Sequence, residues 1–110
     1  MSLLLLGAGP GVDDSGPPPD PPSAEFSGNN LTGTAPLSVD FTDMSSGTPT
    51  SWTWERSLTG EAVWEEFSTD QNPAGVAMEV GTWDIRLTVT NAGGSDDETK
   101  VAYIEATPPE

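Results

Sequence analysis

The stretch Trp83-Asp84-Ile85-Arg86-Leu87-Thr88-Val89-Thr90 decides the fold, because apolar and polar residues alternate along its whole length. A period of two residues is typical of a β-strand with one buried and one exposed face. No segment shows the 3.6-residue period of an amphipathic helix. Shorter stretches with similar alternation, separated by turn-forming residues, lie at 37–42, 51–55 and 99–104, and a weaker one lies at 62–67. Many short strands without helices predict an all-β fold, with the strands packed as a sandwich.

The same alternation predicts which side chains fill the core between the two layers of the sandwich. The predicted core residues are Val39, Phe41, Trp52, Trp54, Trp83, Ile85, Leu87 and Val89. On the last strand, Val101 or Tyr103 would join Ile104 in the core. A large apolar side chain contributes about 1.5–3 kcal/mol when it is fully buried, so this core can hold a small sandwich together without disulfides.

Trp64 is the tryptophan for which core packing is not the preferred interpretation. Acidic residues crowd it in the sequence, at positions 61, 65 and 66. Tryptophan is enriched in protein interfaces, where it offers a large contact area. Trp64 is therefore a candidate interface residue.

The composition excludes several classes of function. The chain has 110 residues, with 18 Asp+Glu against 3 Lys+Arg, a formal net charge of −15, no His and no Cys. So few basic residues cannot displace the counterions of nucleic acid or dock on an anionic membrane. Without Cys there is no disulfide and no thiolate zinc site, and without His most templates of nucleophilic catalysis are excluded. On the strand pattern, the acids fall mostly in loops and at outward strand positions.

Carboxylates remain as the candidates for catalysis. The glutamates that lie near one another in the sequence are Glu55, Glu61, Glu65 and Glu66. Glycoside hydrolysis needs two acids about 5–9.5 Å apart in a cleft, and a domain of this size offers little cleft. No nucleophile is paired with a base. We therefore expect no enzyme activity and no cofactor.

Two acidic runs are the candidates for metal binding. Asp13-Asp14 and Asp96-Asp97-Glu98 could supply hard oxygen ligands for Ca²⁺. Neither run has the spaced ligand loop with a central Gly, so a solvated surface is the preferred interpretation and no metal site is predicted. The sequon Asn30-Leu31-Thr32 is interpreted as a chance occurrence.

Residues 1–22 differ in composition from the rest of the chain. Leu3, Leu4, Leu5 and Leu6 form an apolar run, and Gly and Pro dominate the sequence that follows. The run is too short for a membrane span of about 20 residues or for the core of a signal peptide, so we expect synthesis in the cytoplasm without export. The prolines favour an extended polyproline II conformation, in which residues 7–23 reach about 50 Å.

Two interpretations of the leucine run remain open. In the first, Leu3, Leu4, Leu5 and Leu6 bind a partner surface, for example by adding a strand to the edge of its sheet. In the second, the run is part of a disordered tail. We adopt the first. The chain then divides into an arm with a proline-rich linker, a sandwich domain and a short tail, over residues 1–22, 23–107 and 108–110.

The predicted domain resembles a known family, the PKD domain, which is a small immunoglobulin-like sandwich. The similar segments are 33–43 (GTAPLSVDFTD), 45–54 (SSGTPTSWTW), 71–73 (QNP) and 81–91 (GTWDIRLTVTN). The resemblance covers residues 23–106. It fails at residues 55–60 (ERSLTG), where the family usually has D-F-G-D-G. No ion-binding role is therefore transferred from that motif, and we expect a rebuilt loop there.

A single PKD-like domain behind a leucine-containing arm looks like a small virion protein of a tailed phage or archaeal virus. The resemblance implies a capsid decoration or cement protein, anchored by its arm with the domain exposed, and located in the virion. The implied partners are the major capsid protein or other virion proteins, including further copies of itself, and neither nucleic acid nor a membrane. The alternatives are a tail-associated virion protein, an assembly factor, and an extracellular PKD module for adhesion or carbohydrate binding.

Overall fold

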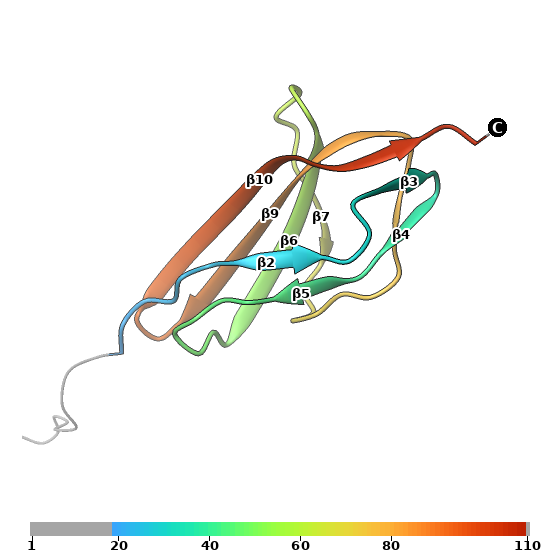
Figure 1. Ribbon diagram of the computed structural model, residues 1–110. Helices are drawn as coiled ribbons and strands as arrows, with labels where there is room; N and C mark the ends of the chain where they lie inside the picture. The colour runs from blue at the N-terminus through green and yellow to red at the C-terminus, as the bar shows by residue number, and fades with distance from the viewer. Residues whose placement is uncertain (1–18, 110) are drawn as a thin grey trace, which may run out of the picture.

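Two layers of β-strand make up the part of the chain that the computed structural model describes, residues 19–109 (Figure 1). The larger layer is a five-stranded sheet in the order β3-β10-β9-β6-β7. Its strands are β3 (Thr32–Thr34), β10 (Gly94–Thr107), β9 (Gly81–Asn91), β6 (Ser51–Leu58) and β7 (Glu65–Ser68). The other layer consists of two strand pairs, β2 (Phe26–Gly28) with β5 (Phe41–Asp43), and β4 (Leu37–Val39) with β8 (Val76–Met78). The predicted all-β, sandwich-like architecture is confirmed.

β9 is the central strand of the larger sheet and contains the alternating stretch 83–90. It pairs antiparallel with β10 on one side and with β6 on the other, which sets Leu87 opposite Trp54. Residues that lie directly opposite one another in such pairs project to the same face of the sheet. Ile85, Leu87 and Val89 therefore share a face with Trp54, and all four side chains are completely buried.

The core lies between this face and the second layer. Trp54 is at its centre, with the ring centroids of Phe26 and Phe41 each 5.3 Å away and that of Phe67 at 6.4 Å. The indole N–H of Trp54 donates to the backbone carbonyl of Asp70 at 2.8 Å, so the polar atom of the ring is satisfied. The second layer and β10 contribute further buried residues, among them Val39, Phe41, Met78, Ile104 and Ala106.

Trp52 and Trp83, both predicted in the core, pack against its rim and are only partly buried. The indole N–H of Trp52 donates to Asp43 Oδ2 at 2.9 Å. That of Trp83 donates to the backbone carbonyl of Glu79, also at 2.9 Å. A tryptophan at such a position buries its apolar body and places its N–H beside a polar partner near the surface.

Several strand boundaries differ from the predicted ones. The predicted strand 37–42 is divided into β4 and β5, and Asp40 between them accepts a hydrogen bond from the N–H of Gly75 at 2.7 Å. β7 begins at Glu65 rather than at residue 62. β10 has 14 residues and begins at Gly94. The prediction placed its start at residue 99, because the charged residues before that position obscure the alternation. The alternation does not predict β2, β3 or β8, since 3 residues are too few to show a period.

The first half of β10 directs charged side chains toward the second layer. Asp96, Glu98 and Lys100 lie opposite buried residues of β9, so they project to the core face of the sheet. The expectation that acids occupy outward strand positions is therefore wrong for Asp96 and Glu98, which are half-buried. Inward-pointing charges near the side of a sheet hinder its pairing with another chain.

A bulge interrupts β10 just before Ile104. Ala102, within the bulge, has a φ of 53° and donates its N–H to Asp84 Oδ1 at 2.8 Å. The same carboxylate oxygen accepts a hydrogen bond from Thr59 Oγ1, and Asp84 is only 9% exposed. Asp84 therefore ties the bulge to the loop that follows β6. The bulge leaves Ile104 fully buried and turns Val101, one of the alternative core residues, out to 68% exposure.

Candidate functional site at the root of the N-terminal arm

Residues 19–23 lie against the turn between β9 and β10, at the end of the sandwich opposite the C-terminus (Figure 1). The side-chain amide of Asn91 donates to the backbone carbonyl of Asp20 at 2.9 Å and to that of Gly47 at 2.6 Å. A Cβ on Gly93 would overlap the carbonyl oxygen of Pro19, so only glycine fits beneath this segment. The point at which the arm joins the domain is therefore fixed.

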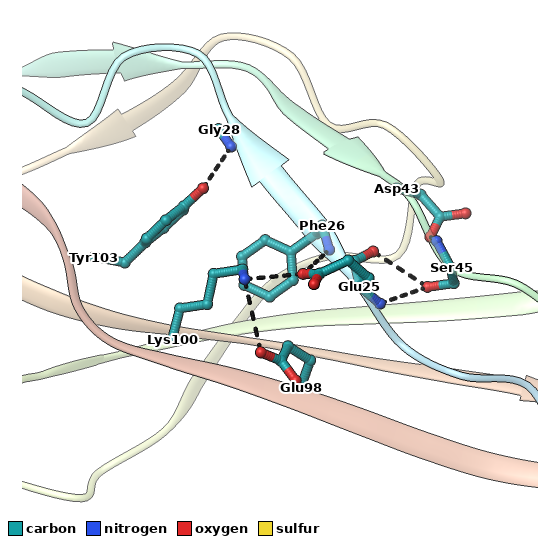
Figure 2. Close-up of polar contacts among 8 residues, drawn as sticks. All are labelled: Glu25, Phe26, Gly28, Asp43, Ser45, Glu98, Lys100 and Tyr103. Atoms are coloured by element: carbon teal, nitrogen blue, oxygen red, sulfur yellow. Dashed lines mark hydrogen bonds and ion pairs between the residues drawn. The ribbon is translucent and has the colours of Figure 1, made fainter.

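Side chains of β10 hold the next residues, 24–28. The N–H of Ala24 donates to Asp96 Oδ2 at 2.7 Å. The N–H of Gly28 donates to the hydroxyl of Tyr103 at 3.0 Å (Figure 2). β2 pairs with β5 over residues 26–28 alone. The first strand of the domain is thus joined to the last one through side chains.

Lys100 is the centre of this contact (Figure 2). Its Nζ lies 2.8 Å from Glu25 Oε1 and 3.6 Å from Glu98 Oε2. The same atom lies 5.1 Å from the ring centroid of Phe26 and 5.7 Å from that of Tyr103. An ammonium group is attracted both by carboxylates and by the faces of aromatic rings. Lys100 therefore closes the side of the sandwich between β10 and β2.

A second carboxylate, Asp43, anchors the loop beside β2 (Figure 2). The N–H of Glu25 donates to Ser45 Oγ at 3.1 Å, and the N–H of Ser45 donates to Asp43 Oδ1 at 2.9 Å. Asp43 Oδ2 accepts hydrogen bonds from Trp52 Nε1 at 2.9 Å and from Gln71 Nε2 at 3.1 Å. Burial raises the pKa of Asp43, but the hydrogen bonds that it accepts outweigh burial and hold the pKa below its ordinary value.

The ion pair of Glu25 and Lys100 shifts the pKa of both groups. The hydrogen bond from the Lys100 ammonium lowers the pKa of Glu25, and the backbone N–H of Phe26 adds to this effect. The same hydrogen bond raises the pKa of Lys100. Each group therefore favours the charged form of the other.

Replacing Lys100 by Met should flatten the pH dependence of stability. The contribution of Glu25 to folding stability is complete above the ordinary pKa of a glutamate and is lost as the pH falls through the lowered pKa of Glu25. That of Lys100 is complete below its ordinary pKa and is lost as the pH rises through its raised value. The urea midpoint of the intact protein should therefore fall below about pH 5 and again above about pH 10.

Urea unfolding of Lys100→Met across the same pH range checks this expectation. Arg86→Met is the matched control, because it removes another half-exposed ion pair, the one with Glu55. Both limbs of the pH profile should be shallower in Lys100→Met than in the control. Profiles of equal steepness in the two variants would show that the Glu25–Lys100 pair does not stabilise the fold.

Arg56 occupies the opposite side of the sandwich in a similar way. It projects from the core face of β6, where its Nε donates to Glu65 Oε1 at 3.1 Å and its Nη1 to the carbonyl of Ala77 at 3.0 Å. Its guanidinium lies 5.5 Å from the ring centroids of Phe67 and of Trp83. Arg56 thereby closes the gap between β7 and β8.

Trp64, the candidate interface residue, covers the third basic side chain. Its ring lies 4.2 Å from the guanidinium of Arg86, on the outer face of the larger sheet. Arg86 Nε also donates to Glu55 Oε1 at 2.9 Å. Trp64 is half-buried, so it covers the arginine and still offers part of its ring to solvent. Its place in an interface stays a prediction.

Of the acidic candidates, Glu55 on β6 and Glu66 on β7 lie opposite each other across the two strands. In the run 96–98, Asp97 projects to the face opposite that of Asp96 and Glu98. Within residues 19–109, no group of His, Cys, Asp or Glu side chains is arranged to hold a metal ion. Two of the clustered glutamates, Glu55 and Glu65, are paired with arginines.

Two predicted features lie outside the described residues, namely the leucine run Leu3, Leu4, Leu5 and Leu6 and the acidic pair Asp13-Asp14. Sequence reasoning also missed the roles of Lys100, Asp43 and Asp84. One available signal was that Lys100 falls inside a predicted strand, where a buried charge needs a partner.

The sequence matches no protein-family model, and the comparison with curated proteins found no similar sequence. Between residues 19 and 109 there is no helix long and apolar enough to cross a membrane. The candidate site therefore depends on geometry: an arm root that is fixed to one end of a small acidic sandwich.

Proposed function

We propose that this protein is a virion structural protein that decorates or cements a capsid, anchored by its N-terminal arm with the sandwich exposed. The observation that carries the proposal is the fixed arm root. Contacts from Asn91, Asp96, Lys100 and Tyr103 hold residues 19–28 to the domain. A force applied through a bound arm is therefore transmitted to the folded domain and does not detach β2 from it first.

We also propose that the sandwich is of the immunoglobulin-like PKD type. The sequence similarity at residues 33–43 and 81–91 supports this assignment. The topology is compatible with it, because the first part of the domain is shared between the layers. β2 pairs with β5 in one layer, and β3 pairs parallel with β10 in the other.

The charge distribution supports an exposed position for the domain. The three basic residues of the chain, Arg56, Arg86 and Lys100, are all engaged in ion pairs within the sandwich. Carboxylates therefore dominate what the domain presents to solvent. Such a surface stays hydrated and repels neighbouring copies, which suits domains that stand side by side on a particle. It leaves attachment to the uncharged leucine run, and the proposed partner is the major capsid protein.

Deleting residues 1–12 should remove the protein from the particle while leaving the domain folded. We expect at least about a tenfold drop in copies per purified particle, which corresponds to about 1.4 kcal/mol per copy. Quantitative mass spectrometry of particles assembled in cells that express the variant measures this number.

The matched control replaces Leu3, Leu4, Leu5 and Leu6 by Ser, which keeps the length of the arm. It should lose incorporation to the same extent, because burial of the leucines supplies the attachment energy. Unchanged incorporation of the deletion variant would overturn the proposal. Hundreds of copies per particle would indicate capsid decoration, and small multiples of three or six would indicate a tail position instead.

A further inference from the structure

The peptide bond between Asp20 and Pro21 lies in the arm root, against the turn between β9 and β10. The carbonyl oxygen of Asp20 accepts a hydrogen bond from Asn91 Nδ2 at 2.9 Å. A Cβ on Gly93 would lie 2.7 Å from the carbonyl carbon of Asp20, so the turn can approach this peptide bond only with glycine at position 93. The fold therefore holds this bond beside a side-chain donor.

The side-chain amide of Asn91 is fixed in orientation. Its Oδ1 accepts the backbone N–H of Gly93 at 2.6 Å and that of Gly94 at 3.2 Å. Its Nδ2 donates to the carbonyl of Asp20 and to that of Gly47, the latter at 2.6 Å. Both ends of the amide are engaged, so the N–H that faces Asp20 stays in place. A donor at 2.9 Å is at the distance from which such groups stabilise a developing oxyanion.

Asp20 carries a nucleophile that reaches its own carbonyl carbon. A side-chain oxygen of an aspartate attacks that carbon through a five-membered ring, so the reacting atoms belong to one residue. The side chain of Asp20 is exposed to water. In most sequences the following backbone N–H competes by attacking the side-chain carboxyl, but Pro21 has no N–H. The sequence Asp20-Pro21 is therefore chemically suited to cleavage at this bond.

We propose that Asp20-Pro21 is a self-cleavage site, at which the folded domain separates from its arm in mild acid. A side-chain oxygen of Asp20 bonds to the carbonyl carbon of the same residue, and negative charge develops on the carbonyl oxygen that faces Asn91. The bond from this carbon to the nitrogen of Pro21 then breaks, and the nitrogen takes the electron pair and the carboxyl proton. One water molecule opens the cyclic anhydride left on residue 20, which gives two carboxyl groups.

Acid is required because the leaving nitrogen needs the carboxyl proton. The turn 91–94 and the loop residues 46–48 pack against residues 19–22, and neither segment carries a titratable side chain. Asp96, the first carboxylate along β10, accepts the N–H of Ala24 instead. Within the described chain, the acid requirement therefore comes from Asp20 itself.

Cleavage divides the chain into residues 1–20 and 21–110 and leaves the domain folded. Ser23 keeps its backbone pairing with Ser46, and the contacts of Ala24 and Gly28 with β10 lie beyond the cut. Each molecule reacts once, and the reaction needs neither a particle nor a capsid protein. The inference therefore goes beyond the proposed function, and it supplies a way to release the exposed domain from a bound arm.

The rate of cleavage in the full-length protein tests the proposal, at the lowest pH at which circular dichroism shows a native fold. Mass spectrometry measures the fragments 1–20 and 21–110. The rate should be about tenfold higher than that of a synthetic peptide of residues 15–26 at the same pH, because the peptide contains the bond without the donor. Urea that unfolds the domain should lower the rate in the protein to that of the peptide.

Two variants identify the groups that act. Asn91→Ala removes the donor and should cleave at the rate of the peptide. Its matched control is Asn30→Ala, which also removes a side-chain amide that donates to a backbone carbonyl, that of Ser38 at 3.0 Å, and should cleave at the parent rate. Asp20→Glu keeps the charge but needs a six-membered ring, so it should cleave at least about tenfold more slowly than the parent.

A folded protein that cleaves no faster than the peptide would overturn the proposal. So would an Asn91→Ala or an Asp20→Glu variant that cleaves at the parent rate. The comparisons with the peptide and with urea decide the matter even where Asn91→Ala does not fold. Particle incorporation is a separate measurement, so the proposed function can stand when this inference fails.

Discussion

Trp54→Ala should remove a large part of the domain's stability. Removing a fully buried tryptophan costs about 3–5 kcal/mol, out of a total stability of about 5–15 kcal/mol for a small domain. Trp54 is completely buried and contacts the rings of Phe26, Phe41 and Phe67, so the cavity cannot collapse without moving both layers. The carbonyl of Asp70 would also lose its donor. Urea unfolding followed by circular dichroism measures the change.

Trp64→Ala is the control for this experiment. Trp64 lies on the outer face over Arg86 and fills no cavity. Its removal should cost about 1 kcal/mol or less, the size of one cation–π contact at a half-exposed site. If the two alanine variants had the same urea midpoint, the assignment of Trp54 to the centre of the core would be wrong.

Arg56→Ala should cost about 2 kcal/mol, a large loss for a residue at the edge of the core. The substitution leaves the carbonyl of Ala77 without its donor and removes the guanidinium that lies 5.5 Å from the ring centroids of Phe67 and of Trp83. It leaves no buried charge behind, because the side chain of Glu65 is 64% exposed. Thermal unfolding should show a lower Tm.

Arg56→Met separates packing from hydrogen bonding at the same position. Methionine fills the space of the arginine stem but cannot donate to Ala77, so about half of the lost stability should return. A methionine variant as unstable as the alanine variant would assign the whole effect to the hydrogen bonds. An alanine variant with an unchanged Tm would mean that Arg56 does not close the gap between β7 and β8.

The long strands could be predicted from the sequence because their alternation extends over enough residues to show a period. The stretch 83–90 falls within β9, and six of the eight predicted core residues are fully or almost fully buried. β2, β3 and β8 could not be predicted, since tertiary pairing defines strands of 3 residues. The acidic start of β10 was missed because its inward charges break the alternation; in the structure Asp96 accepts the N–H of Ala24 and Glu98 pairs with Lys100.

The candidate site was predictable only in part. Composition alone distinguishes residues 1–22 from the rest of the chain, but the contacts that fix residues 19–28 join residues far apart in the sequence. Glu25 and Lys100 meet because β2 lies over β10, and no local pattern encodes that contact. The ion pairs of the three basic residues could not be predicted either, since each residue could equally have been a solvated surface charge.

The placement of the basic side chains also determines how the protein meets proteases. Trypsin cleaves after Lys and Arg, and in this chain all three such residues lie within strands, Arg56 in β6, Arg86 in β9 and Lys100 in β10. A peptide bond in a paired strand cannot enter a protease active site until the strand detaches. Tryptic cleavage after Arg56 or Arg86 therefore reports the opening of the sandwich, whereas the bond after Lys100 lies at the bulge of β10, where the register with β9 is interrupted.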